Sequence, residues 1–461
     1  MTSARRQAEG RGQDSASVVQ SRRTAGIWTP HAGLKTLLRL VAAGLVVLGL
    51  TGCGTIGKRH QDAINTANTR WLSMRSALIG KMAQQQFDAG DLDQAEKTLL
   101  NALALDPTNA VLHTLAGRVA LERSHLERSY HRLQTAIELD EDRPEAPYYL
   151  GIVFQRWQQY DRALEHFRRA YELEADNAAY LLAVAEMYIT TDQLDAALEL
   201  LQSKMRYFDQ NAGIRIAIGQ VYTIMHRYDE AAEYFRKGAL LRPDDLAIVE
   251  ELALAQFQAG QFDQATRNLK RLCRAVDSGQ WPGSGTSKQE PAGNVTNRQP
   301  SDTSHRPDLK RALAECYLQQ DRLADAKAVY IKLIRQDRTD ADAWAKLAQI
   351  AWTEGDEKAT LLAAQRVIAV APDRYEGYLM SGMVWQKRGR LDQAIRLFDR
   401  AADAAPDNAL PLILRGLTLE QAGKTEQAAM AYTQALHRAP QDQRARKLLT
   451  HVGQQAVASG Q

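Results

Sequence analysis

The chain has 461 residues, which is too long for one compact core, so it must either divide into domains or repeat. Its composition, 45% hydrophobic and 25% charged with 3 cysteines, excludes a collagenous, wholly disordered or disulfide-stapled protein. Residues 1–52 hold seven basic and two acidic residues, a net charge of +5, which leaves −2 for the rest of the chain. A body so close to neutrality lacks the basic face that nucleic acid requires, so we expect no nucleic-acid partner.

The N-terminal segment has the pattern of a secretory signal. Two basic residues precede a short apolar run at 40–50, which leads into the tetrapeptide LTGC at 50–53. This tetrapeptide resembles the lipobox of bacterial lipoproteins. The resemblance implies that residues 1–52 are a signal peptide with a long polar leader, and that Cys53 carries the lipid (a palmitate-type acylation) after cleavage.

Two locations remain open for the anchored protein. Gly54 follows the cysteine where many lipoproteins kept in the inner membrane have aspartate, so the outer membrane, with the body facing the periplasm, is the expected place. The alternative is an uncleaved anchor in the inner membrane, because residues 40–57 form an uncharged stretch of just sufficient length. Both interpretations attach the protein to a membrane of the bacterial cell envelope.

A 34-residue period begins at Ser76 and predicts the fold. Six copies run without a gap over 76–279, and four more follow over 307–442. Position 8 is small in every copy, position 20 is small as well, and position 24 is bulky in nine copies. Small residues at such positions let antiparallel helices cross closely. Position 8 is occupied by Ala83, Gly117, Gly151, Ala185, Gly219, Ala253, Ala314, Ala348, Gly382 and Gly416.

Proline at position 32 of five copies completes a pattern that resembles the tetratricopeptide repeat (TPR). The resemblance implies an all-α TPR solenoid of about ten helix-hairpin repeats that forms a right-handed superhelix. In this family the concave wall is formed by first-helix positions 2, 5, 9 and 12. The carboxylate clamp of some relatives, with Lys and Asn at positions 5 and 9, is not matched here.

Three segments flank or interrupt the repeats. Residues 53–75 are expected to form a lipid-anchored tether, reaching to about residue 60, and then an N-terminal helix. Residues 280–306 are rich in Gly, Pro, Ser and Thr, and we expect a disordered insertion, with a partner-binding loop as the alternative. Residues 443–461 are expected to form a C-terminal capping helix and tail, because polar side chains surround a few apolar ones.

Motifs of catalysis are absent from the sequence. No phosphate-binding loop, nucleophile elbow or metal-ligand spacing occurs, and the 10 histidines are scattered. Once signal, repeats and insertion are subtracted, no stretch is left for a catalytic domain. We therefore expect a protein that is not an enzyme and takes no cofactor, metal or small-molecule substrate.

The expected function is recognition of partner proteins of the envelope by the concave wall. Apolar side chains at wall positions favour a groove for an extended or helical peptide. A non-catalytic scaffold or assembly factor is the first hypothesis, and an adaptor that recruits a hydrolase or protease to its substrates is the alternative. The groove candidates are Phe87, Arg118, Leu121, Tyr148, Ile152, Leu182, Ile189, Ile216, Leu254, Phe257, Leu318, Trp352, Leu379 and Met383.

Cys273 and Cys316 lie on either side of the insertion. The repeat frame places Cys273 on the second helix of the sixth copy and Cys316 on the first helix of the seventh. Because those helices pack together in a stacked solenoid, the two thiols should be near neighbours. Two hypotheses stay open: a disulfide across this joint, or two separate buried thiols.

Overall fold

The computed structural model describes residues 34–280 and 306–459, with side chains from 58 to 454. This part of the chain forms twenty-one α-helices and no β-strand, so the expected all-α repeat fold is confirmed. The helices are α1 Leu34–Asp88, α2 Leu92–Leu105, α3 Ala110–Glu122, α4 Leu126–Leu139, α5 Glu145–Arg156, α6 Tyr160–Leu173, α7 Ala178–Thr190, α8 Leu194–Lys204, α9 Ala212–Ile224, α10 Tyr228–Leu241, α11 Leu246–Gln258, α12 Phe262–Asp277, α13 Pro307–Gln319, α14 Leu323–Gln336, α15 Ala341–Thr353, α16 Glu357–Val370, α17 Tyr375–Lys387, α18 Leu391–Ala404, α19 Leu410–Gln421, α20 Thr425–Arg438 and α21 Gln443–Ser459.

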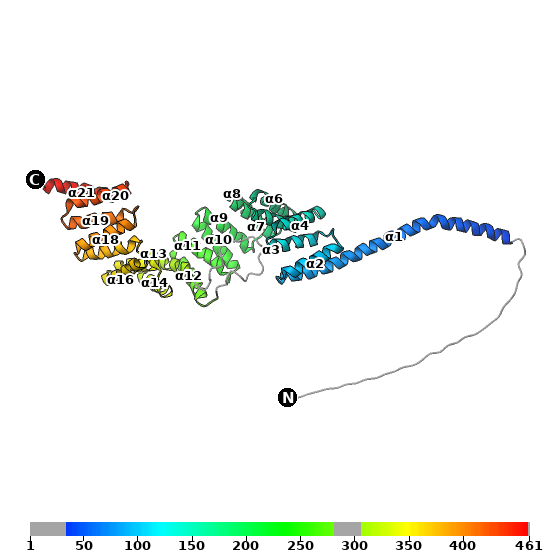
Figure 1. Ribbon diagram of the computed structural model, residues 1–461, viewed down its shortest axis with the longest axis horizontal. Helices are drawn as coiled ribbons and strands as arrows, with labels where there is room; N and C mark the ends of the chain where they lie inside the picture. Colours follow the sequence, from blue (N-terminus) through cyan, green and yellow to red (C-terminus); the bar gives the residue numbers. More distant parts are fainter. Residues whose placement is uncertain (1–33, 281–305, 460–461) are drawn as a thin grey trace, which may run out of the picture. The chain divides into compact units, whose positions relative to one another are not determined.

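The first unit of the chain ends at Pro107 and contains α1 and α2. Helix α1 extends well beyond the stretch that packs beside α2 (Figure 1). The expected tether between Cys53 and residue 60 is helical instead, as part of α1. No proline interrupts residues 34–88, so the helix continues, and eight helical residues span about 12 Å rather than the 25 Å of an extended tether.

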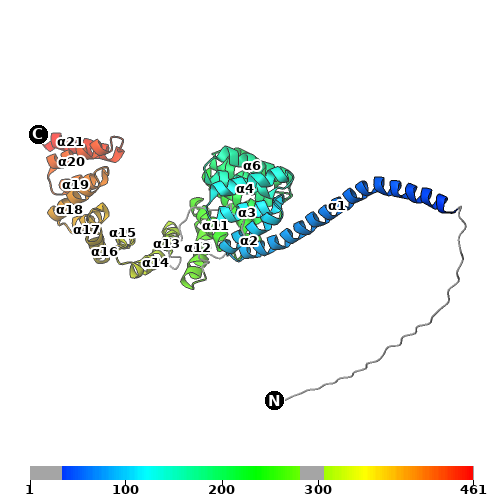
Figure 2. The ribbon, with the colours of Figure 1, turned by 45° about the vertical axis from the view of Figure 1, so that its right-hand side comes forward.

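The second unit, from Thr108 onward, contains nine hairpins and the final helix α21. Each helix packs against the next in chain order, as the hairpins from α17 to α20 show in Figure 2. The cores lie within and between consecutive hairpins and are built largely from alanine and leucine, with buried aromatic rings in some of the repeats. Because each hairpin buries its apolar face only against its neighbours, the repeats depend on one another for stability.

The small residue at position 8 accommodates the bulky residue at position 24 of the same repeat. A Cβ atom added to Gly151 would lie 2.6 Å from Cε1 of Phe167, and one added to Gly382 would lie 2.6 Å from Cε1 of Phe398. Position 20 adds a second close contact, since Ser129 Oγ donates a hydrogen bond of 2.8 Å to the carbonyl oxygen of Gly117. The two helices of a hairpin therefore cross as closely as the sequence pattern predicted.

Position 15 of each repeat ends the first helix in the left-handed conformation. The amide N–H three residues after the helix donates a hydrogen bond to a carbonyl in its last turn, as from Gln159 to Phe154 at 2.9 Å. Only half of these positions are glycine, so the others adopt an unfavourable φ of 57–60°. The residues are Gly90, Ser124, Gln158, Asp192, His226, Gly260, Asp321, Gly355, Gly389 and Gly423.

One hairpin departs from the pattern at the position where the sequence does. Lys204 occupies a position expected to be small, and α8 ends there after 11 residues, whereas α6 and α10 have 14. The Lys204 ammonium instead lies 5.9 Å from the centre of the Tyr171 ring. A long charged side chain is thus placed at the surface where other repeats continue the helix.

Cys273 and Cys316 lie in one core cluster, on α12 and α13, on either side of the segment outside the described residues. Both thiols are buried and free, so no disulfide joins them in this structure. Burial raises the pKa of each thiol to about 11. They behave here as small apolar residues that fill the joint between the sixth and seventh repeats.

Replacing Gly151 by leucine should lower the free energy of unfolding by at least about 1–3 kcal/mol, because the new side chain must displace the Phe167 ring. Thermal melting measures the effect. Gly453→Leu is the matched control, since this helical glycine of α21 has nothing within 4 Å of an added Cβ. A Gly151→Leu protein that melts like the control would show that positions 8 and 24 do not meet.

The two buried thiols should react with iodoacetamide only slowly in the native protein. A pKa of about 11 leaves about 100-fold less thiolate at pH 8 than the ordinary value of 9, and burial slows the reagent further. Peptide mass spectrometry after timed labelling measures this rate, with the urea-unfolded chain as control. Failure of both thiols to label in urea without reductant would instead reveal a disulfide.

Candidate functional site

A groove of about 730 Å³ lies across the first helices of three consecutive repeats, α13, α15 and α17. Most of its residues occupy positions 2, 5, 9 and 12 of those helices, which is the set that the repeat frame assigns to the concave wall, and position 6 contributes further residues. Ala345 and Ala312, both small, leave the space between the helices open. The groove is lined by Arg311, Ala312, Glu315, Tyr330, Asp342, Ala345, Lys346, Gln349, Trp352, Arg374, Tyr375, Glu376, Leu379, Met380 and Met383.

The floor of the groove is apolar and closely packed. Leu379 and Met380 of α17 are 8% and 9% exposed, and Tyr330 of α14 is buried as well. Trp352 and Met383 are half-buried and pack against the small core cluster of repeats eight and nine. A partner side chain that entered here would exchange water for an apolar surface, a gain of about 1.5–3 kcal/mol for a Leu- or Phe-sized group.

The charged residues at the edges of the groove are already paired with one another. Lys346 Nζ lies 3.1 Å from Glu315 Oε2, which joins α15 to α13. Arg374 forms ion pairs with Asp342 and, at 2.6 Å, with Glu376. The hydrogen bond from Arg374 lowers the pKa of Asp342. The lining therefore carries three cations and three anions, and none of these pairs favours a strongly charged ligand.

Arg311 adds one directional polar group to the groove. Its Nη2 donates a hydrogen bond of 2.8 Å to Asp340 Oδ2, which holds the guanidinium in place. Its Nε is buried and has no hydrogen-bond partner among the described residues. A buried donor without a partner destabilises the free protein, so a ligand carbonyl that reached this atom would gain a hydrogen bond without breaking one.

The structure brings three of the fourteen predicted groove residues together in this groove: Trp352, Leu379 and Met383. Leu121, Tyr148 and Ile152 lie in the core between repeats, at 1–4% exposed, where the Tyr148 ring centre is 4.9 Å from that of Tyr180. The remaining eight are half-buried on first helices elsewhere, namely Phe87, Arg118, Leu182, Ile189, Ile216, Leu254, Phe257 and Leu318.

The groove also contains residues that sequence analysis did not select. Tyr330 comes from a second helix, and Met380 from a position normally turned toward the core. A small residue at one wall position, such as Ala345, predicts neither an open groove nor a packed core by itself. A comparison of position 5 across the copies would have shown alanine there between Arg311 and Leu379.

A half-buried carboxyl group joins α5 to α7 on the equivalent face of the fourth repeat. Gln155 Nε2 donates a hydrogen bond of 2.9 Å to Glu186 Oε1. Burial raises the pKa of Glu186 to about 7, although the Gln155 hydrogen bond acts in the opposite direction. The Glu186 carboxyl group therefore titrates near neutral pH, whereas Arg374 lowers the pKa of Asp342 in the groove.

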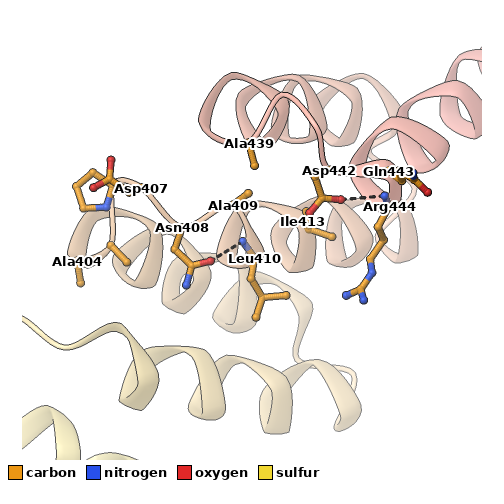
Figure 3. Close-up of a pocket in the computed structure, with 12 residues that line it drawn as sticks. Ala404, Asp407, Asn408, Ala409, Leu410, Ile413, Ala439, Asp442, Gln443 and Arg444 are labelled. Atoms are coloured by element: carbon orange, nitrogen blue, oxygen red, sulfur yellow. Dashed lines mark hydrogen bonds between the residues drawn. The ribbon is translucent and has the colours of Figure 1, made fainter. Parts of the chain in front are cut away.

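A second hollow, of about 1010 Å³, lies near the turns around α19 and the start of α21. Its polar side chains already serve the backbone: Asn408 Oδ1 accepts from the Leu410 N–H at 2.9 Å, and Asp442 Oδ1 accepts from the Arg444 N–H at 2.8 Å (Figure 3). These contacts order the helix starts. The hollow is therefore a gap between turns, and the groove on α13, α15 and α17 is the stronger candidate site.

Several expectations concern residues outside the described part. The leader before residue 34, the insertion at 281–305 and the side chain of Cys53 belong to this group. Within the described residues, no group of three or more His, Cys, Asp or Glu side chains is placed to hold a metal ion. None of the helices searched there is both long and apolar enough to cross a membrane.

Replacing Glu186 by glutamine should raise the free energy of unfolding by about 1–3 kcal/mol at pH 8 and have little effect at pH 4.5. The raised pKa means that the folded state holds the Glu186 proton more tightly than the unfolded state. The contribution of this group to the free energy of unfolding is therefore lost as the pH rises from about 4.5 to 7. Urea unfolding at several pH values measures the difference. Parallel stability curves for the two proteins would contradict the raised pKa.

Family models match the repeats in both halves of the chain. Residues 156–238 match the model described as anaphase-promoting complex, cyclosome, subunit 3. One tetratricopeptide-repeat model matches 301–350, and another matches 217–279 and 359–409. No curated protein matches the sequence.

Solved structures with a similar chain include a tetratricopeptide repeat protein from Parabacteroides merdae, 15% identical, covering 56% of this chain and 91% of its own with a TM-score of 0.39. YrrB, described as a TPR protein with an unusual peptide-binding site, is 20% identical, with coverage of 37% and 89% and a TM-score of 0.32. PilF of Pseudomonas aeruginosa is 16% identical, with coverage of 50% and 92% and a TM-score of 0.38. The ten-copy period, the helical hairpins and the family-model matches together identify the chain as a tetratricopeptide repeat protein, a scaffold of the kind that binds peptides or other proteins.

Proposed function

We propose that this protein is a lipid-anchored scaffold of the bacterial cell envelope, which holds an apolar segment of a partner protein in the groove formed by α13, α15 and α17. The observation that carries the proposal is the apolar floor of Leu379, Met380 and Trp352 between edges whose charges are already paired. Such a site selects for apolar side chains and shape.

The partner segment is expected to be short and to carry one or two large apolar residues. Its backbone would meet Arg311, whose Nε is without a hydrogen-bond partner among the described residues, as donor to a carbonyl. Since the lining has no net charge, electrostatic steering by the groove is weak. Affinity then depends on how well the anchor residues fill the space beside Trp352 and Met383.

Membrane attachment is proposed from the sequence around Cys53. A basic flank, an apolar run at 40–50 and the LTGC tetrapeptide stand in the order that a lipoprotein signal requires. Anchoring confines the scaffold to a surface, which raises the effective concentration of partners attached to the same membrane.

Substitution of Met383 by glutamate should weaken the affinity for the partner by at least about tenfold, because an unpaired carboxylate would be buried on the apolar floor. Quantitative crosslinking and affinity capture from membranes measures binding. Met430→Glu is the control: Met430 is 62% exposed, lies outside the groove and undergoes the same change. Equal loss of the same partners from both variants, or no loss from either, would contradict the groove assignment.

Substitution of Cys53 by serine should leave the precursor uncleaved or release the protein from the membrane fraction. Intact mass and membrane fractionation of the wild type and the variant measure this. An unchanged mass together with unchanged fractionation would refute the lipid anchor and leave the groove proposal standing.

A further inference from the structure

Helix α1 carries an exposed apolar stripe that the proposed groove does not use. Five large apolar side chains, at 47–67% exposed, lie within residues 64–82. They make up five of the thirteen large apolar side chains that are exposed among the described residues, so they form a patch and are not scattered single residues. The stripe consists of Ile64, Trp71, Met74, Leu78 and Met82.

The stripe lies on the side of α1 that faces away from α2. At 100° per residue the five positions fall within an arc of about 80°. Ser76 and Ala83 are fully buried on the side where α2 packs, more than 100° around the helix from the middle of the stripe. In Figure 1, α2 lies beside only the C-terminal part of α1, and the helix projects beyond it. No contact within the α1–α2 hairpin therefore covers the stripe.

Basic side chains border the stripe on both sides. Residues 58–82 contain five Lys or Arg residues and one acidic residue, Asp62. Helical register places Arg70 and Lys81 along one border and Arg75 along the other, and all three are exposed. The Arg75 guanidinium also lies 5.2 Å from the centre of the Trp71 ring. The exposed apolar face is thus framed by positive charge.

We propose that residues 58–82 of α1 lie along an anionic lipid surface, with the stripe inserted between the headgroups and the flanking cations against the phosphates. A tryptophan and flexible apolar side chains bordered by Lys and Arg are the features that hold a helix in the plane of a membrane interface. A second copy of the chain fits this face poorly. Two such stripes packed together would oppose like charges along both borders.

The register of α1 connects this surface to the proposed anchor. Cys53 precedes Trp71 by 18 residues, which is five helical turns, so position 53 falls on the same face of the helix as the stripe. The inference goes beyond the lipid anchor and does not require it. If Cys53 is acylated, the lipid and the stripe enter the membrane from one side of one helix, and the two contacts reinforce each other.

The test places a polarity-sensitive dye on the stripe of the full chain. In a Cys53→Ser protein, Met74→Cys supplies one exposed thiol, while Cys273 and Cys316 are buried. Phosphatidylcholine vesicles with and without phosphatidylglycerol are then added. We expect a blue shift and a several-fold rise in dye emission with the anionic vesicles only. Lys81→Gln should raise the lipid concentration needed for half the response by about fivefold.

The same dye on Leu240→Cys is the matched control, since Leu240 is 70% exposed on α10 and far along the chain from the stripe. Its emission should not change. A protein that sediments with vesicles while the dye at position 74 stays in water would overturn the inference without bearing on the proposed lipid anchor, because this variant lacks Cys53. An equal response on neutral vesicles, or a blue shift that depends on protein concentration without lipid, would also overturn it. The last result would identify a second copy as the occupant.

Discussion

The structure depends on one short distance that recurs in nine of the ten hairpins, between the backbone at position 8 and the bulky side chain at position 24. A methyl group at Gly151 would come within 2.6 Å of the Phe167 ring, and the same holds for Gly219 and Phe235 at 2.7 Å. This contact sets the separation of the two helices, and the separation sets which faces remain for the next hairpin. A repeat that keeps it presents its wall positions at the same angle as its neighbours, whatever side chains those positions carry.

That constraint explains why the fold was predictable and part of the backbone was not. Positions 8, 20 and 24 repeat in residue size, so the hairpins follow from the period alone. The left-handed turn at position 15 occurs in all ten copies, but half of these positions are not glycine, as Gln158 and His226 show. The closing hydrogen bonds of the helix impose the conformation, and no residue type reveals it. The period begins at Ser76, so it does not predict how far α1 extends toward the N-terminus. The helix begins at Leu34 because nothing between residues 34 and 76 interrupts its hydrogen bonding.

The same constraint explains why only some predicted wall residues form a site. Position 5 is Tyr148 in the third repeat, and its ring fills the space up to Tyr180, so that stretch of wall is closed. Position 5 is Ala345 in the eighth repeat, and the space remains open between Arg311 and Leu379. A groove thus arises from a small residue between larger neighbours two repeats apart. The residue type at one wall position of one repeat does not predict such a groove, because the sizes of the residues in neighbouring repeats decide it. The wall positions themselves were predicted correctly for Trp352, Leu379 and Met383.

Helix α1 combines both kinds of surface in one element. One side, at Ser76 and Ala83, is buried where α2 packs against the helix. The other side, at Trp71 and Leu78, is exposed and makes no packing contact within the hairpin. Because these faces point in roughly opposite directions, a membrane bound to the stripe leaves α2 on the side of α1 that is turned away from the lipid. The chain therefore leaves the first hairpin from the water-facing side. A continuous helix fixes this direction more firmly than a flexible tether, since rotation about its axis is set by the stripe itself.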